Sequence, residues 1–342
     1  MIDSKTTDWQ ERARQEMDQK VKPPGSLGRL EAVAIDLAAY LQTLEPRVAR
    51  GRILIFAADH GISREGVSAY PREVTAQMAK TFASGGAAIT VLARSLDLEV
   101  EVIDVGVDAD LPAMPGVAAA KVCRGTRSFL REPAMTFEEL DAALAAGRAA
   151  VDRAVSAGVE TVGLGEMGIG NTTSAAALLS ALTGAPPSET VGRGTGVDDE
   201  RLAAKRAVVE ASLRLHAAAL DEPRSALAAV GGLEIAALAG AAIECARRRR
   251  VVLVDGFIST VAVLAAVRFD PSVRPALVFS HRSAEAGHDR ALTALGGTAL
   301  LDLGMRLGEA TGSALAFPIV KAAAAILREM ATFAQAGVST ES

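Results

Sequence analysis

Residues 163–173, with the sequence GLGEMGIGNTT, form the densest run in the chain that could bind a ligand. Glycines permit close approach of the backbone, and Asn171 and Thr172 suit the first turn of a helix, where free N–H groups attract an anion such as a phosphate monoester. The run is neither a GxGxxG motif in the usual dinucleotide-binding context nor a GxxxxGK[ST] motif. The run by itself therefore fits a phosphate site and a tight packing turn equally well.

A second glycine-rich segment, residues 191–196, precedes a helical stretch that carries Lys205. Arg193 and Lys205 could complete a phosphate clamp, because a guanidinium and an ammonium both donate to anionic oxygens. An isolated lysine is more simply explained as part of a solvated helix face. Only the neighbouring glycine segments make the clamp a serious alternative.

Two acidic residues could do chemistry. Glu309 lies in an apolar neighbourhood, where burial would raise the pKa of its carboxyl and make it a proton acceptor near neutral pH. The simpler alternative is a carboxylate that caps the following helix. Asp255 ends the apolar run 251–254 and could bind ribose hydroxyls or a ring nitrogen, or cap the next helix. A Mg²⁺-dependent diphosphate site would favour two adjacent acids here, so the single Asp255 weakens that possibility.

The histidines are His60, His216, His281 and His288, and none belongs to an HExxH motif or another set with metal-ligand spacing. We therefore expect no metal centre. His60 follows Asp59 at the end of one apolar run and His281 ends another. Each could line a ligand crevice or make a structural hydrogen bond, so the roles of Asp59, His60 and His281 stay open.

The composition excludes several classes of protein. The 342 residues are 50% hydrophobic and 23% charged with a net charge of −5, which excludes global disorder. Aromatic residues make up 4%, and 36 basic residues face 41 acidic ones, so we expect no nucleic-acid partner. The run Arg247–Arg250 is expected at a helix end. Residues 226–243 are mostly Ala and Gly and include Glu234, so they predict a buried helix and turn rather than a membrane span.

The cysteines and the first residues bear on the compartment. Cys123 and Cys245 are far apart and outside any CxxC motif, which favours reduced core thiols. Residues 1–20 are densely charged and contain no apolar segment of the kind found in a secretory signal. We expect a cytoplasmic protein.

Short apolar runs alternate with Ala-rich helical stretches through the middle of the chain. This alternation predicts an α/β fold, with a mostly parallel, Rossmann-like sheet flanked by helices. The ligand crevice of such a sheet lies at the carboxyl ends of the strands, where most residues named above fall. The predicted strands cover residues 52–57, 98–105, 161–164, 251–254 and 276–279.

Both ends of the chain are expected to be helical. Prolines and glycines at 22–28 interrupt the first helical segment, and apolar residues recur at helical spacing from Leu30 to Leu41. We expect the two ends to pack together as a small helical domain, residues 1–45 plus 291–342. The large α/β domain would then span residues 46–290.

Ordered blocks between residues 22 and 309 resemble the nicotinate-nucleotide:dimethylbenzimidazole phosphoribosyltransferase family. Together they are far more specific than any one of them. The blocks are KPPGSLGRLE at 22–31, ADHG at 58–61, the run 165–173, GRG at 192–194, VDGF at 254–257, SHRS at 280–283 and RLGE at 306–309.

The resemblance implies transfer of phosphoribose from nicotinate mononucleotide to 5,6-dimethylbenzimidazole, giving α-ribazole 5′-phosphate and nicotinate. It implies a homodimer that needs no cofactor or metal, with Glu309 as the catalytic carboxylate and the substrates in the large domain. The candidate substrate-binding residues are Glu166, Met167, Gly168, Ile169, Gly170, Asn171, Thr172, Arg193, Gly194, Lys205 and Asp255.

The residues agree with that chemistry. Nicotinate joined to ribose through its ring nitrogen is a pyridinium and leaves without a protonating acid. A benzimidazole must lose its N–H proton as it attacks, and one carboxylate can accept it. The hypothesis is direct displacement with inversion from β to α, with Glu309 as general base.

Two departures from the family pattern leave the acceptor open. Ala310 stands where a second glycine often follows the glutamate, and residues 68–75, expected near the acceptor base, transfer less well. Other benzimidazoles, purines or phenolic bases are therefore possible acceptors. Two other functions remain alternatives, a Mg²⁺- and diphosphate-dependent phosphoribosyltransferase and a noncatalytic nucleotide-binding sensor.

Overall fold

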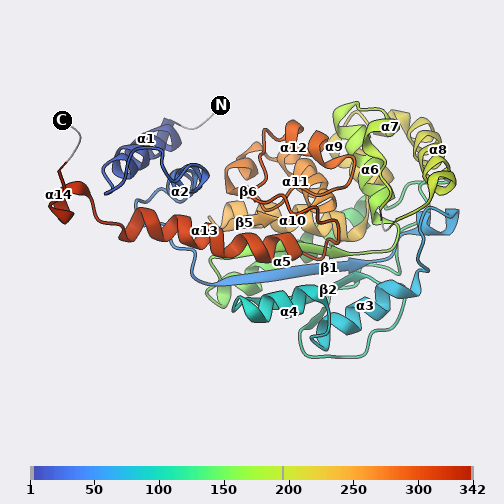
Figure 1. Cartoon of the computed structure of the whole chain (residues 1–342). Helices are drawn as coiled ribbons and strands as arrows, with labels where there is room; N and C mark the ends of the chain where they lie inside the picture. Colours follow the sequence, from blue (N-terminus) through green and yellow to red (C-terminus); the bar gives the residue numbers. More distant parts are fainter. Residues whose placement is uncertain (1–3, 195, 340–342) are drawn as a thin grey trace.

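Six parallel strands form one sheet, in the order β3-β2-β1-β4-β5-β6, in the computed structural model, which describes residues 4–194 and 196–339 (Figure 1). The strand order reverses between β1 and β4, and a parallel sheet binds ligands at such a point. The predicted α/β class is confirmed. The strands are β1 (Gly51–Ala58), β2 (Glu99–Gly106), β3 (Val117–Ala119), β4 (Thr161–Met167), β5 (Val251–Val254) and β6 (Leu277–Phe279).

Strand β3 was not among the strands predicted from the sequence. The other strands are marked by apolar runs, because central parallel strands are buried on both faces and the opposite edge strand, β6, still has the apolar sequence LVF. In contrast, β3 is a short edge strand with the sequence VAA, and its residues are half-buried or exposed. Such a segment has no hydrophobic pattern to distinguish it from a loop.

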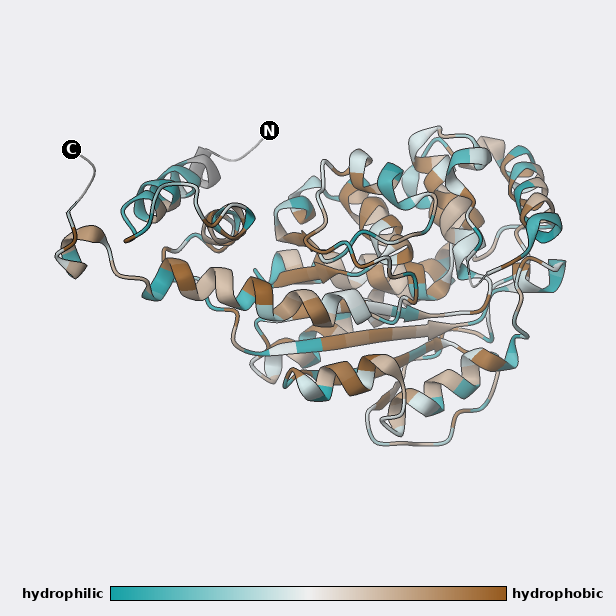
Figure 2. Cartoon of the chain, viewed as in Figure 1, coloured by the Kyte–Doolittle hydropathy of each residue, from teal (hydrophilic) through white to brown (hydrophobic). Residues whose placement is uncertain are grey.

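Helices cover both faces of the sheet (Figure 1). α5, α10 and α11 pack on one face, and α3, α4 and α13 pack on the other. Figure 2 shows hydrophobic residues along β1, whereas the coloured part of α1 is mostly hydrophilic. The helices are α1 (Ser4–Asp18), α2 (Arg29–Leu41), η1 (Gly61–Glu65), α3 (Glu73–Ala83), α4 (Ala88–Ser95), α5 (Phe137–Ser156), α6 (Asn171–Thr183), α7 (Pro187–Thr190), α8 (Asp199–Leu215), η2 (Ala217–Ala219), α9 (Pro223–Val230), α10 (Leu233–Arg247), α11 (Phe257–Phe269), η3 (Pro271–Ala276), α12 (His288–Ala294), α13 (Thr311–Glu329) and α14 (Phe333–Ala336).

The two ends of the chain lie side by side (Figure 1). α2 packs on α1 and α13, and an isolated antiparallel bridge joins Lys20 to Thr332. α12 crosses the predicted boundary at residue 290 and packs on α11 and α7, and α13 contacts β1, β4 and β5 as well as α2. The division into residues 46–290 and 1–45 plus 291–342 stays a prediction.

The apolar helices are core elements. Residues 226–243 form parts of α9 and α10, where Glu234 is fully buried, as the Ala- and Gly-rich composition predicted. α13 is the helix in the described part of the chain with the length and apolar composition to span a membrane, and 56% of its most apolar window is buried against the rest of the protein. α10 ends at Arg247, where Arg247 and Arg248 pair with Glu244, which confirms the expected helix end.

Both cysteines are free thiols. Cys245 is buried in the core, as predicted. Cys123 is only half-buried, because it follows the edge strand β3 in a loop, so the prediction of a core position was wrong for this residue. Burial still raises the pKa of the Cys123 thiol to about 11.

Candidate active site

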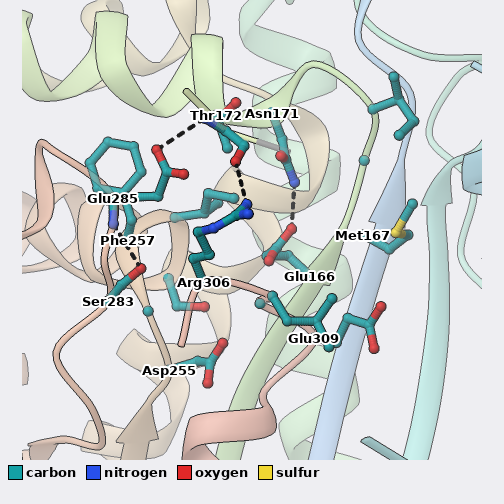
Figure 3. Close-up of a pocket in the computed structure, with 18 residues that line it drawn as sticks. Glu166, Met167, Asn171, Thr172, Asp255, Phe257, Ser283, Glu285, Arg306 and Glu309 are labelled. Carbon is teal, nitrogen blue, oxygen red and sulfur yellow. Dashed lines mark hydrogen bonds between the residues drawn. The ribbon is translucent and has the colours of Figure 1, made fainter. Parts of the chain in front are cut away.

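One pocket lies at the carboxyl ends of β4 and β5 and holds Glu166, Asp255 and Glu309 together (Figure 3). Its empty volume is about 630 Å³, part of it open to solvent. The strand ends supply the first two carboxylates, and the loop before α13 supplies the third. The lining residues are Glu166, Met167, Gly168, Ile169, Asn171, Thr172, Gly194, Asp255, Gly256, Phe257, Ile258, Ser259, Ser283, Glu285, Arg306, Leu307, Gly308 and Glu309.

Glu166 stands at the end of β4 and is 6% exposed. Its carboxylate accepts a hydrogen bond from the Asn171 side-chain amide (Figure 3). Gly308 lies directly against it, since a Cβ at Gly308 would come within 2.3 Å of Glu166 Oε1. Burial raises the pKa of Glu166 to about 8, and the negative charges of Glu234 and Asp255 add to the shift. Glu166 is therefore largely protonated at neutral pH in the empty pocket.

Glu309 is also buried, in an unusual backbone conformation. Gly308, Glu309 and Ala310 have φ angles of 84°, 61° and 68°, so the three residues form a left-handed turn immediately before α13. Burial, helped by the charge of Asp255, raises the pKa of Glu309 to about 7. Its Oε2 atom has no hydrogen-bond partner within the described part of the chain. The carboxylate is thus available as a proton acceptor near neutral pH.

Asp255, rather than Glu309, caps α13. Asp255 Oδ1 accepts hydrogen bonds from the backbone N–H groups of Gly312 (2.7 Å) and Ser313 (3.2 Å). The sequence analysis allowed a cap on the next helix, α11, but the capped helix lies more than fifty residues further along the chain. Burial raises the pKa of Asp255, and His281, whose Nε2 lies 3.7 Å from Oδ1, opposes this shift.

A smaller hollow of about 300 Å³ adjoins the pocket at the N-terminus of α6. Lys205 on α8 lines it and is 1% exposed, so the solvated-face alternative is wrong. Lys205 Nζ donates to Thr172 Oγ1 (2.8 Å) and to the Gly192 carbonyl (3.2 Å), and burial lowers the pKa of the ammonium to about 8. Gly170 also lines this hollow. A helix N-terminus beside a buried ammonium favours an anion.

Arg193 lines the same hollow, but its guanidinium binds its own loop. It donates to the Val197 carbonyl (3.0 Å) and to the Asp199 carboxylate. Thr195, in the same glycine-rich segment, lies outside the described residues. The structure therefore brings Lys205 to Thr172 and leaves Arg193 engaged elsewhere.

Several pocket residues had no role in the sequence analysis, among them Phe257, Ser283, Glu285 and Arg306. Arg306 Nη1 donates to the Gly194 carbonyl (3.1 Å), and Glu285 accepts from the Gly194 N–H (3.3 Å) (Figure 3). Phe257, Ser283 and Arg306 stand in blocks that carry the family resemblance, which was the available signal. Glu285 lies outside these blocks and lines the pocket because distant loops meet there.

The histidines do not line the pocket. His60 Nε2 lies 2.5 Å from Glu234 Oε1, and both side chains are fully buried behind Gly168. Asp59 accepts from the Asp108 N–H (2.8 Å). Within residues 4–194 and 196–339, no group of three or more His, Cys, Asp or Glu side chains is arranged to hold a metal ion.

Comparisons with known proteins agree with this architecture. A phosphoribosyltransferase family model matches residues 2–338. The nicotinate-nucleotide–dimethylbenzimidazole phosphoribosyltransferase of Cupriavidus necator is 52% identical over 326 residues, which cover 95% of this chain and 94% of the relative. The protein of the same name from Pseudomonas aeruginosa is 51% identical over 328 residues, covering 96% and 93%.

A solved structure is also similar. The crystal structure of CobT from Thermus thermophilus is 47% identical and superposes with a TM-score of 0.94, covering 98% of this chain and 100% of that chain. The likeness therefore extends through the sheet, the pocket and both ends of the chain. With this fold and this identity over nearly its whole length, the chain belongs to the nicotinate-nucleotide–dimethylbenzimidazole phosphoribosyltransferase family.

Proposed function

We propose that this enzyme transfers phosphoribose from nicotinate mononucleotide to 5,6-dimethylbenzimidazole, giving α-ribazole 5′-phosphate and nicotinate. The names of its relatives support the substrates. The observation that carries the proposal is the buried Glu309 carboxylate, which has a pKa of about 7 and shares a pocket with an anion-binding hollow. A base and a phosphate site side by side are what the reaction requires.

The donor phosphate fits the hollow beside Lys205. The ammonium of Lys205 and the N–H groups at the start of α6 offer donors to a phosphate. The ribose would then extend toward Glu166 and the carboxyl end of β5. This orientation brings the anomeric carbon into the part of the pocket that Glu309 lines.

The reaction forms one bond and breaks another at the anomeric carbon. The C1′–N bond to nicotinate breaks, and its electron pair returns to the ring nitrogen, which neutralises the pyridinium. One nitrogen of the benzimidazole forms the new bond from the opposite face, with inversion from β to α. The proton on its other nitrogen passes to the Glu309 carboxylate and then to water.

Product analysis tests the proposal. The purified protein is incubated with nicotinate mononucleotide and a panel of benzimidazoles, purines and phenols, without added metal. We expect nicotinate release and a nucleoside phosphate whose mass matches 5,6-dimethylbenzimidazole or another base of the panel. Absence of nicotinate release with every base would contradict the proposal, and turnover that needs Mg²⁺ and a diphosphate donor would favour another phosphoribosyltransferase class.

We also propose that the enzyme is a homodimer, as the family resemblance implies, and that it is cytoplasmic. The two free cysteines fit a reducing compartment. Sedimentation equilibrium of the purified protein tests the assembly, because a monomer has the chain mass of 35.2 kDa and a dimer twice that mass.

A further inference from the structure

The loop that carries Glu309 adopts a conformation that needs outside support. Glu309 and Ala310 are L-residues with φ angles of 61° and 68°. Such residues seldom adopt the left-handed region, and they persist there only where the surroundings over-determine the backbone. Something beyond the loop itself must therefore hold this turn.

The support comes from the residue that caps α13. Asp255, 2% exposed at the end of β5, accepts hydrogen bonds from Gly312 and Ser313, the residues that follow the turn. The fit is tight, since a Cβ at Gly312 would come within 2.0 Å of His281 Cδ2 and 2.9 Å of Asp255 Oδ1. The first turn of α13 is therefore fixed against the ends of β5 and β6.

The His281 imidazole lies beside the Asp255 carboxylate. It is 1% exposed, and its Nε2 lies 3.7 Å from Asp255 Oδ1. Neither ring nitrogen has a hydrogen-bond partner in the described part of the chain. The imidazole is thus a polar neighbour of the buried Asp255 carboxylate, which accepts from the two N–H groups of α13.

We propose that Asp255 is a positioning residue for the reaction. Its carboxylate, backed by His281, anchors the first turn of α13 and so holds Glu309 in the left-handed turn from which it lines the pocket. The inference rests on the proposed function of Glu309 as general base. It differs from a contact to ribose hydroxyls, because it assigns Asp255 Oδ1 to two backbone N–H groups of α13.

The two roles predict different kinetics. A ribose contact contributes to donor affinity, so its loss raises the KM and Kd for nicotinate mononucleotide. A misplaced base lowers kcat and leaves donor binding intact. We expect Asp255→Ala to lower kcat by about 100-fold, with donor Kd changed by less than about threefold. Asp255→Asn keeps an acceptor oxygen and should recover most of the lost kcat.

A second substitution makes the test specific to the turn. Ala310→Gly removes the Cβ that disfavours the left-handed conformation. If Asp255 acts by holding the turn, Ala310→Gly added to Asp255→Ala restores part of the lost kcat, and the two changes are not additive. Thr136→Ala is the control, because it removes the cap of α5 away from the pocket and should lower Tm without changing kcat.

The outcomes separate the possible failures. A rise in donor Kd with unchanged kcat in Asp255→Ala, or strict additivity with Ala310→Gly, would overturn the positioning role. If Asp255→Ala does not fold, Asp255→Asn decides the question. The positioning role predicts near-wild-type kcat and donor Kd for this variant, and a rise in its donor Kd with unchanged kcat would overturn the role. Failure of the wild-type enzyme to release nicotinate would contradict the proposed function instead.

Discussion

At the scale of single residues, burial sets the protonation of the pocket. Glu166 and Glu309 both have raised pKa values, about 8 and about 7, because each loses water and faces other carboxylates. The difference between them matters for catalysis. Glu309 has the lower pKa of the two, and its Oε2 has no hydrogen-bond partner in the described part of the chain, whereas Glu166 accepts a hydrogen bond from Asn171. Glu309 is therefore the better proton acceptor of the two.

Glu309→Gln tests this assignment. The amide has the same shape but cannot accept the benzimidazole proton, so we expect kcat to fall by about 10²- to 10⁴-fold. Donor binding, measured by calorimetry, should be retained. Glu138→Gln, on the exposed side of α5, is the matched control and should behave as wild type. Near-normal turnover of Glu309→Gln would remove Glu309 from the role of base.

The pH dependence of kcat follows from the same pKa. Glu309 accepts a proton only when ionised, so kcat should decline as pH falls below about 7. Bound substrate shifts the pKa of Glu309 and with it the midpoint of the kcat profile. The pH profile of kcat/KM for the acceptor reports the pKa of Glu309 before the acceptor binds. We expect this decline of kcat on the acidic side of a profile measured from pH 5 to pH 9, about four pH units. The residual activity of Glu309→Gln should not show the decline. If Glu309→Gln shows the same decline of kcat at low pH, a group other than Glu309 causes it.

At the scale of elements, the carboxyl end of β4 makes room for the loop that carries the base. A Cβ at Gly165 would come within 2.8 Å of Ala310 Cβ and 2.9 Å of the Glu309 carbonyl carbon. Cβ atoms in real structures essentially never come this close to other atoms. A side chain at position 165 would therefore displace either the strand or the turn. The glycine in β4 thus allows the left-handed turn to lie directly on the sheet.

Gly165→Ala should therefore impair catalysis more than binding. Displacement of the turn moves Glu309, and we expect kcat to fall by about 100-fold with little change in donor KM. Gly184→Ala is a matched control, because Gly184 has φ 70° at the end of α6 with nothing near its added Cβ. That control should lower Tm and keep kcat. Equal kcat values for the two variants would contradict the packing argument.

The contact between α8 and α6 gives a prediction for donor affinity. Lys205→Met keeps most of the buried volume but removes the ammonium beside Thr172. A hydrogen bond to a charged group is worth about 1.5–3 kcal/mol, so donor KM should rise by about 10- to 100-fold. The dephosphorylated nucleoside should react equally well with both proteins. An equal loss with that nucleoside would refute a phosphate contact.

At the scale of the whole molecule, ionisation of the buried Glu166 lowers the free energy of unfolding at high pH. The folded-state pKa of Glu166 is about 8, above its ordinary value of 4.5, so the folded protein holds a proton that the unfolded chain has released between these values. The stabilisation is fully present below pH 4.5 and is lost as pH rises toward 8. Burial of a carboxyl group thus makes the empty enzyme less stable under alkaline conditions.

Glu166→Gln should remove this dependence. The side-chain amide of the variant can still accept a hydrogen bond from Asn171 and carries no charge. The Tm of the variant minus that of wild type should therefore increase from pH 5 to pH 9, a range of about four pH units that includes the raised pKa of Glu166. Thermal unfolding of both proteins without ligand measures the difference. A Tm difference that is constant across this range would show that Glu166 does not titrate as its burial implies.

Most of the fold could be predicted because burial leaves a local pattern. Apolar runs marked β1, β2, β4, β5 and β6, and the glycine-rich run at 165–173 marked the start of α6. Strand β3 could not be found in this way, because its sequence VAA is half-buried or exposed and carries no such pattern. The resemblance supplied the candidate residues, and the pocket contains the three predicted carboxylates.

The amino-acid sequence determined five of the strands, β3 excepted, and also which residues could carry charge and where the ligand crevice lies. Tertiary structure alone decided that Lys205 is buried against Thr172, that Asp255 caps α13 rather than α11, and that Glu309 stands in a left-handed turn. Each of these facts depends on contacts between residues far apart in the chain. Local patterns report burial and helical or strand period, but they do not report which distant group satisfies a buried charge or holds a strained turn.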